Sequence, residues 1–140
     1  MSENRNAPTL LLLAWTLALV ATLGALFIGE VMGQMPCVLC WYQRIAMFPL
    51  ALLLGIAALR GDLAAWTYAL PISVIGLAVA GYHSLLYAGI IPAPIVPCQA
   101  TGPSCAGEGM LFAGIPIPYL SALSFAAISV LLLPLKRNTP

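Results

Sequence analysis

Long apolar stretches separated by a few charged residues dominate the pattern along the chain. Uncharged stretches cover residues 6–29, 45–59, 63–107 and 109–135. A helix that crosses a bilayer core of about 30 Å needs about 20 residues, so the third stretch is too long for a single helix. Its second half is rich in proline between residues 92 and 103, which predicts that the helix stops near Tyr87. The pattern therefore predicts four membrane-spanning helices, at roughly 9–29, 41–59, 65–87 and 117–135.

Composition makes lipid the expected solvent for these helices. Hydrophobic residues make up 62% of the chain and charged residues 6%, against roughly 45–50% and about 25% in soluble domains. A soluble or disordered chain is therefore excluded, and a net charge of +1 offers no basic surface for nucleic acid. Backbone groups in lipid must be paired within their own segment. We expect an all-α membrane protein, a single four-transmembrane-helix bundle over residues 1–140.

Proline and charge refine this picture. Pro49 and Pro71 are expected to kink their helices without breaking them, because neighbouring helices can satisfy the freed carbonyls. The first apolar stretch is too long for a signal peptide and lacks a small-x-small cleavage site, so we expect it to be retained. The positive-inside rule predicts cytoplasmic termini, because this orientation leaves a single basic residue, Arg44, outside and puts four inside: Arg5, Arg60, Lys136 and Arg137.

The two outer segments, at about residues 30–40 and 88–116, contain the four cysteines: Cys37, Cys40, Cys98 and Cys105. The outer side is the oxidising side, where disulfides persist, so this placement indicates disulfide chemistry. A disulfide between Cys37 and Cys40 would close a very short loop and stabilise little, so a redox couple explains the pair better. Cys98 and Cys105 flank a polar stretch, as an exposed and exchangeable disulfide would. Structural disulfides and a zinc site are the alternative interpretations, although the second spacing is atypical for zinc.

Two polar residues within the predicted spans suggest where the electrons go. Cys40 should begin the second helix, whose N-terminus and Arg44 one turn further both favour a thiolate. His83 is predicted at a depth similar to that of Arg44, so the two are expected to share a pocket. The sequence has no flavin, nucleotide, haem or iron–sulfur motif. A quinone needs only an apolar slot, with Arg44 stabilising negative charge and His83 supplying a proton. A snorkelling arginine and an interhelical histidine hydrogen bond are the alternatives.

The segment Pro36-Cys37-Val38-Leu39-Cys40-Trp41-Tyr42-Gln43-Arg44 resembles the signature of the disulfide bond formation protein B family, DsbB, called BdbC in many Gram-positive bacteria. The resemblance extends over nearly the whole chain. It implies a multi-pass protein of the bacterial inner membrane, with extracytoplasmic cysteine loops. It also implies a quinone reductase, using ubiquinone or menaquinone, that reoxidises an extracytoplasmic thioredoxin-like dithiol oxidase of the DsbA or BdbD kind.

The resemblance further implies a role for each cysteine. Cys98 would be attacked by the partner's thiolate, Cys105 would exchange with Cys37, and Cys40 would face the quinone beside Arg44 and His83. The short loop between Cys98 and Cys105 is similar to that of BdbC-type members, and Gln43 replaces an acid found in some relatives. Two alternatives stay open. A protein similar to vitamin K epoxide reductase would carry its C-x-x-C late in the chain, and a non-catalytic membrane module would use its cysteines as braces.

Overall fold

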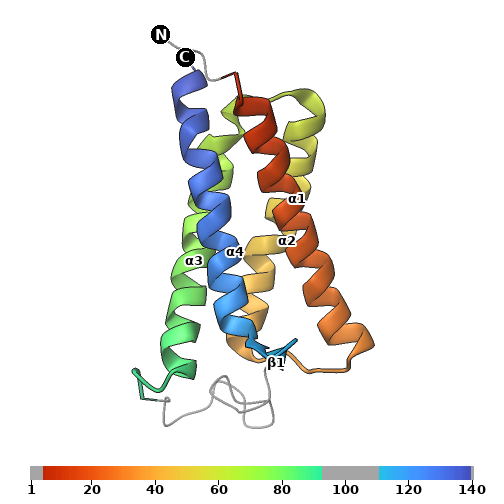
Figure 1. Cartoon of the computed structure of the whole chain (residues 1–140), viewed down its shortest axis with the longest axis vertical. Helices are drawn as coiled ribbons and strands as arrows, with labels where there is room; N and C mark the ends of the chain where they lie inside the picture. Colours follow the sequence, from red (N-terminus) through yellow and green to blue (C-terminus); the bar gives the residue numbers. More distant parts are fainter. Residues whose placement is uncertain (1–4, 93–110, 140) are drawn as a thin grey trace.

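Four long helices form an elongated antiparallel bundle in the computed structural model, which describes residues 5–92 and 111–139. Neighbours along the chain pack on each other, and α1 also packs on α4, so the bundle is closed. Both termini lie at one end of the bundle and the connection from α1 to α2 lies at the other (Figure 1). The helices are α1 (Ala7–Leu26), α2 (Val38–Arg60), α3 (Trp66–Tyr87) and α4 (Ile117–Leu132).

Shorter helical segments extend three of these four helices. A π-helix, η1 (Phe27–Val31), continues α1, and a 3-10 turn, η2 (Leu63–Ala65), precedes α3. A second 3-10 segment, η3 (Leu133–Asn138), follows α4. The predicted four-helix bundle is confirmed, with one clear shift: α2 begins at Val38 instead of at the predicted residue 41.

The outward faces of the bundle are apolar, as lipid requires. The four helical segments have mean hydropathies between 1.6 and 2.4 and are long enough to cross a membrane. Large aliphatic side chains point away from the bundle, since Ile45, Leu52 and Leu123 are 65%, 66% and 69% exposed. In water such surfaces would cost about 25 cal/mol per Å². The chain is therefore built as a multi-pass membrane protein.

Small residues allow the helices to approach closely inside the bundle. A Cβ at Gly76 of α3 would overlap the ring of Phe125 from α4, which is fully buried. Ser73, one turn earlier, shares a 2.9 Å hydrogen bond with Ser129 and also donates to the Phe125 carbonyl. Close approach at small residues and hydrogen bonds between helices are the usual means of helix association in lipid.

The two prolines within the helices do not break them. Pro49 lies inside α2 and Pro71 inside α3, and both helices continue through them. α2 ends at Arg60 and is capped by Gly61, whose φ of +66° is the left-handed conformation that glycine adopts readily. Asp62 then accepts a 3.0 Å hydrogen bond from the Ala64 amide and starts the next helical segment.

A short hairpin precedes α4 in the loop where no strand was expected. It pairs β1 (Leu111–Phe112) with β2 (Ile115–Pro116) in antiparallel register. The two residues between the strands, Ala113 and Gly114, both have positive φ, as a tight two-residue hairpin turn requires. The hairpin places Phe112 at the end of the bundle where α2 begins.

Candidate functional site

Cys37 and Cys40 lie together at the first turn of α2. Cys37 is the N-cap residue, with an extended backbone, and Cys40 lies within the first turn. Their sulfur atoms are 3.6 Å apart, so they are in contact without being bonded to each other. Cys37 is disulfide-bonded, whereas Cys40 carries a free thiol.

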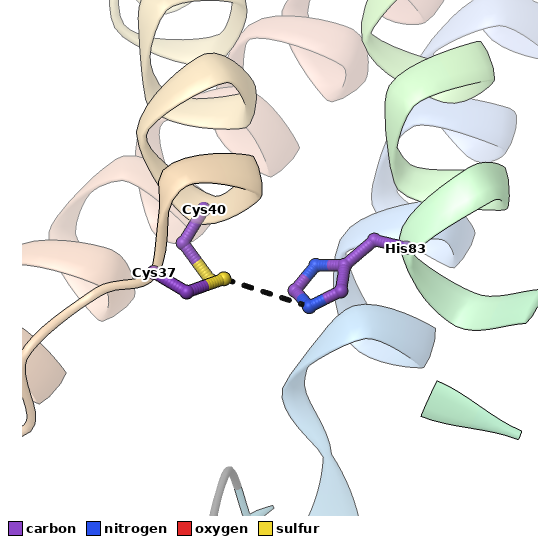
Figure 2. Close-up of side chains that lie close together, drawn as sticks. All are labelled: Cys37, Cys40 and His83. Carbon is purple, nitrogen blue, oxygen red and sulfur yellow. Dashed lines mark hydrogen bonds between the residues drawn. The ribbon is translucent and has the colours of Figure 1, made fainter. Parts of the chain in front are cut away.

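His83 of α3 packs directly against this pair. Figure 2 shows its ring pointing at the two cysteines across the gap between α2 and α3. The His83 Nε2 atom is 3.8 Å from Cys37 Sγ, and the imidazole is completely buried. On the other side of the ring, the Gln43 side-chain amide nitrogen lies 2.8 Å from His83 Nδ1.

The rotation of α3 that aims His83 at α2 is fixed by its neighbour. The Ser84 hydroxyl donates a 3.2 Å hydrogen bond to the Pro118 carbonyl at the start of α4. Tyr87, one turn further, meets Tyr119 edge to face at 5.8 Å between ring centres. These contacts hold α3 against α4, and in this orientation the His83 side chain reaches Cys37 and Gln43 on the α2 side.

Arg44 points the other way, toward α1. Its Nη2 atom donates a 2.8 Å hydrogen bond to the carbonyl of Ala25 in the last turn of α1. The guanidinium also lies 5.4 Å from the centre of the Trp41 ring, within cation–π range. Gly29 in η1 leaves room for it, since a Cβ there would lie 2.9 Å from Nη2. Arg44 is thus held by protein contacts on the α1 side of α2.

An apolar cavity of about 290 Å³ opens between α1, α2 and α4 beside these residues. Its volume is near the lower end of ligand pockets, which run from about 300 to 1,000 Å³. Cys40, Gln43 and Arg44 contribute polar atoms to a lining that is otherwise largely apolar, with Phe48 and Phe112 among the aromatic side chains. The free thiol of Cys40 therefore faces an apolar space large enough for a small hydrophobic molecule.

The structure separates two residues that the sequence placed in one pocket. Arg44 and Cys40 line the cavity, but His83 is not among its lining residues. The residues instead follow an order across the end of the bundle: His83, Cys37, Cys40, then the cavity with Arg44. The sequence gives His83 and Arg44 a similar depth in the membrane, but it does not show that the two side chains lie on opposite sides of α2. Cys98 and Cys105 lie outside the described residues.

Two residues of this site were missed as participants in the sequence analysis. Gln43 was noted only as a replacement, yet it lies between the cavity and His83 and contacts both. Its position three residues after Cys40 was a usable signal, since residues three apart share a helix face. Phe112 enters the cavity wall from the hairpin, and the Ala113-Gly114 turn between apolar residues was its sequence signal.

The cysteine pair and His83 also have the separation of metal ligands. Their ligand atoms all lie within 4.8 Å of one another. Structural zinc takes four ligands, with cysteines bound as thiolates. Because Cys37 is disulfide-bonded in this state, its sulfur is not a thiolate ligand, and the arrangement fits sulfur exchange better.

A membrane-embedded bundle with a cysteine pair in sulfur contact at one end defines a class of thiol–disulfide proteins. Comparison with known families places the chain within that class. The family model described as "Disulfide bond formation protein DsbB" matches residues 7–135. The chain belongs to the DsbB family, whose members are membrane proteins of disulfide bond formation with an oxidoreductase role. The family expected from the Pro36–Arg44 segment is confirmed.

Curated relatives agree with this assignment. The chain is 60% identical to a "Probable disulfide formation protein" of Metapseudomonas resinovorans, over 93% of this chain and 91% of the relative. It is 38% identical to "Disulfide bond formation protein C" of Bacillus subtilis, over 94% of this chain and 96% of the relative. A "Probable disulfide formation protein" of Coxiella burnetii is 42% identical over 86% and 82% of the two chains. No solved structure matches the chain.

Proposed function

We propose that the protein is a membrane thiol:quinone oxidoreductase. In this proposal it reoxidises an extracytoplasmic thioredoxin-like dithiol oxidase and passes the electrons through two cysteine pairs to ubiquinone or menaquinone. The observation that carries the proposal is the free thiol of Cys40 in the wall of an apolar cavity, next to the sulfur of Cys37. A cysteine pair, which as a dithiol can donate two electrons, meets a hydrophobic binding space at that atom.

The cavity residues fit a quinone. Apolar side chains from three helices and the hairpin would enclose the ring and exclude water, and the outward opening would admit it from lipid. Gln43 and Arg44 offer hydrogen-bond donors for carbonyl oxygens, and the cation would stabilise negative charge at such an oxygen. When bound, a quinone supplies a two-electron acceptor beside Cys40.

The arrangement of charges supports cytoplasmic termini and extracytoplasmic cysteines. The termini share one end of the bundle, opposite the connection between α1 and α2. The tight turn after Arg60, which joins α2 to α3, lies at the end of the bundle that holds the termini. The basic pair Lys136 and Arg137 lies at the same end. Under the positive-inside rule this end faces the cytoplasm. The cysteine pair then faces the oxidising compartment.

An acceptor other than a thiol explains why the cycle runs forward. A strongly oxidising partner of the DsbA kind has a potential near about −120 mV, whereas protein disulfide isomerase is near about −180 mV. A disulfide of the latter potential would be about 60 mV too reducing to reoxidise the partner, which is roughly 2.8 kcal/mol uphill. Transfer of the electrons to the membrane quinone pool removes this obstacle.

Purification in a mild detergent, followed by solvent extraction and a visible spectrum, tests the proposal. We expect co-purified quinone and a long-wavelength absorbance band when Cys40 is a thiolate beside it. The Cys40→Ser variant should lose the band. The matched variant Cys37→Ser should keep it, because Cys37 does not line the cavity. Absence of extractable quinone from the wild-type protein, or a band that survives in Cys40→Ser, would overturn the proposal.

A further inference from the structure

The imidazole of His83 is buried on the side of the cysteine pair that faces away from the cavity. Quinone binding in the cavity does not explain this position. His83 is separated from the cavity and contacts the sulfur that is already engaged in a disulfide. From this placement we infer that His83 is the hydrogen-bond donor to Cys37 during thiol–disulfide exchange, and that Gln43 positions it for that role. The inference rests on the proposed relay, in which Cys37 changes its sulfur partner.

Gln43 determines which ring nitrogen of His83 carries the proton. The amide nitrogen of Gln43 can only donate, so His83 Nδ1 accepts the 2.8 Å hydrogen bond. In a neutral imidazole the proton is then on Nε2, the nitrogen that is 3.8 Å from Cys37 Sγ. The ring therefore presents an N–H to the Cys37 sulfur.

Such a donor is needed when the disulfide of Cys37 opens. An incoming thiolate attacks the other sulfur of that disulfide, a new S–S bond forms there, and the electron pair of the broken bond stays on Cys37 Sγ. This step is an exchange with no net oxidation. Cys37 is only 1% exposed, so water cannot solvate the new thiolate. The Nε2–H of His83 stabilises it with a hydrogen bond.

The Cys40 thiol also contacts this sulfur, at 3.6 Å, but a thiol is a weak hydrogen-bond donor. Among the described residues, the cysteines, histidine and acids that cluster here are Cys37, Cys40 and His83. Arg44, on the same helix as Cys40, is directed at the α1 carbonyl of Ala25. The imidazole N–H of His83 is therefore the strongest described donor at Cys37, whereas the cavity side of the pair has Arg44.

The test is the pH dependence of Cys37 alkylation in the purified, fully reduced full-length protein. Iodoacetamide labelling over about pH 5 to 9, with peptide mass spectrometry, gives a midpoint for each cysteine in one digest. Restricted access of the reagent slows labelling at every pH, whereas the pKa of the thiol sets the midpoint. In His83→Asn the Cys37 midpoint should move up by about one pH unit, a roughly tenfold slower reaction near neutrality, and that of Cys40 by less.

A variant at Gln43 provides the second arm. Gln43→Leu removes the group that orients the ring and should shift the Cys37 midpoint in the same direction. Unchanged Cys37 midpoints in His83→Asn and Gln43→Leu, or equal shifts at Cys37 and Cys40, would overturn the inference. The assay contains no quinone, so it is independent of whether quinone reduction itself is confirmed.

Discussion

Replacing Gly29 with alanine should displace Arg44 without damaging the fold. An added Cβ would lie 2.9 Å from Nη2 and 3.4 Å from Nη1 of Arg44, closer than carbon and nitrogen normally approach. The atoms it meets are at the free end of a flexible side chain, so the guanidinium can move by a few tenths of an ångström. That movement strains or breaks the 2.8 Å hydrogen bond to the Ala25 carbonyl and moves the cation relative to the cavity.

The expected magnitudes differ for stability and for quinone use. Alanine is about 0.5–1 kcal/mol better than glycine inside a helix, which offsets much of the local strain. A hydrogen bond from a charged donor is worth about 1.5–3 kcal/mol, and losing the lower value at a quinone oxygen weakens binding about tenfold. Gly29→Ala should therefore raise the KM for quinone about tenfold while changing the unfolding free energy by less than about 1 kcal/mol.

Gly81→Ala is the matched control, because nothing lies within 4 Å of a Cβ at that position in α3. Thermal unfolding in detergent and quinone reduction kinetics are measured for both variants and for the wild-type protein. The control should keep the wild-type KM. A Gly29→Ala protein with wild-type KM would refute the role given to the position of the Arg44 guanidinium.

The other predictions concern the packing of α3 on α4. Gly76→Ala should destabilise the bundle by about 1–3 kcal/mol, measured by thermal unfolding, because its Cβ would overlap the buried Phe125 ring; a melting temperature equal to that of the α3 control would contradict this. Ser73→Ala removes the hydrogen bonds to Ser129 and to the Phe125 carbonyl. It should lower the unfolding free energy by only about 0.6 kcal/mol, the average for hydrogen bonds between helices in lipid. A loss of unfolding free energy above about 3 kcal/mol would show that the site is not an ordinary interhelical contact.

The bundle was predictable because charges mark the helix ends. Every predicted helix is present, since runs of about 20 apolar residues have no other way to pair their backbone groups in lipid. The start of α2 was misplaced by three residues because charge spacing says nothing about capping. The extended backbone of Cys37 makes it the N-cap, and the helix begins directly after it. The π-helix after Leu26 had no signal in the apolar pattern.

The site was predictable only in part. The positions of Cys40 and Arg44 on one helix fix their separation, and both line the cavity as their spacing suggested. His83 was correctly placed near the cysteine end, but periodicity gives depth along α3 and not its rotation relative to α2. That rotation depends on contacts such as the one from Ser84 to Pro118. The contact between His83 and Cys37 therefore required coordinates.

These positions divide the cysteine pair into two sides with different surroundings. Cys37 lies against an imidazole in a buried, water-excluded site, whereas Cys40 faces an apolar cavity that also contains an arginine. A relay needs such a division, because one sulfur must exchange with other sulfurs while its neighbour delivers electrons. The 3.6 Å contact between the two sulfurs allows them to bond to each other once Cys37 leaves its present partner.

Quinone reduction by a reduced thioredoxin-like partner under anaerobic conditions tests the central claim most directly. The loss of quinone absorbance is followed alongside the thiols remaining in the partner. The account predicts that one quinone is reduced for each dithiol oxidised, and that Cys40→Ser abolishes the reaction although the protein stays folded. Partner oxidation that proceeds in Cys40→Ser, or that consumes no quinone in the wild-type protein, would contradict it.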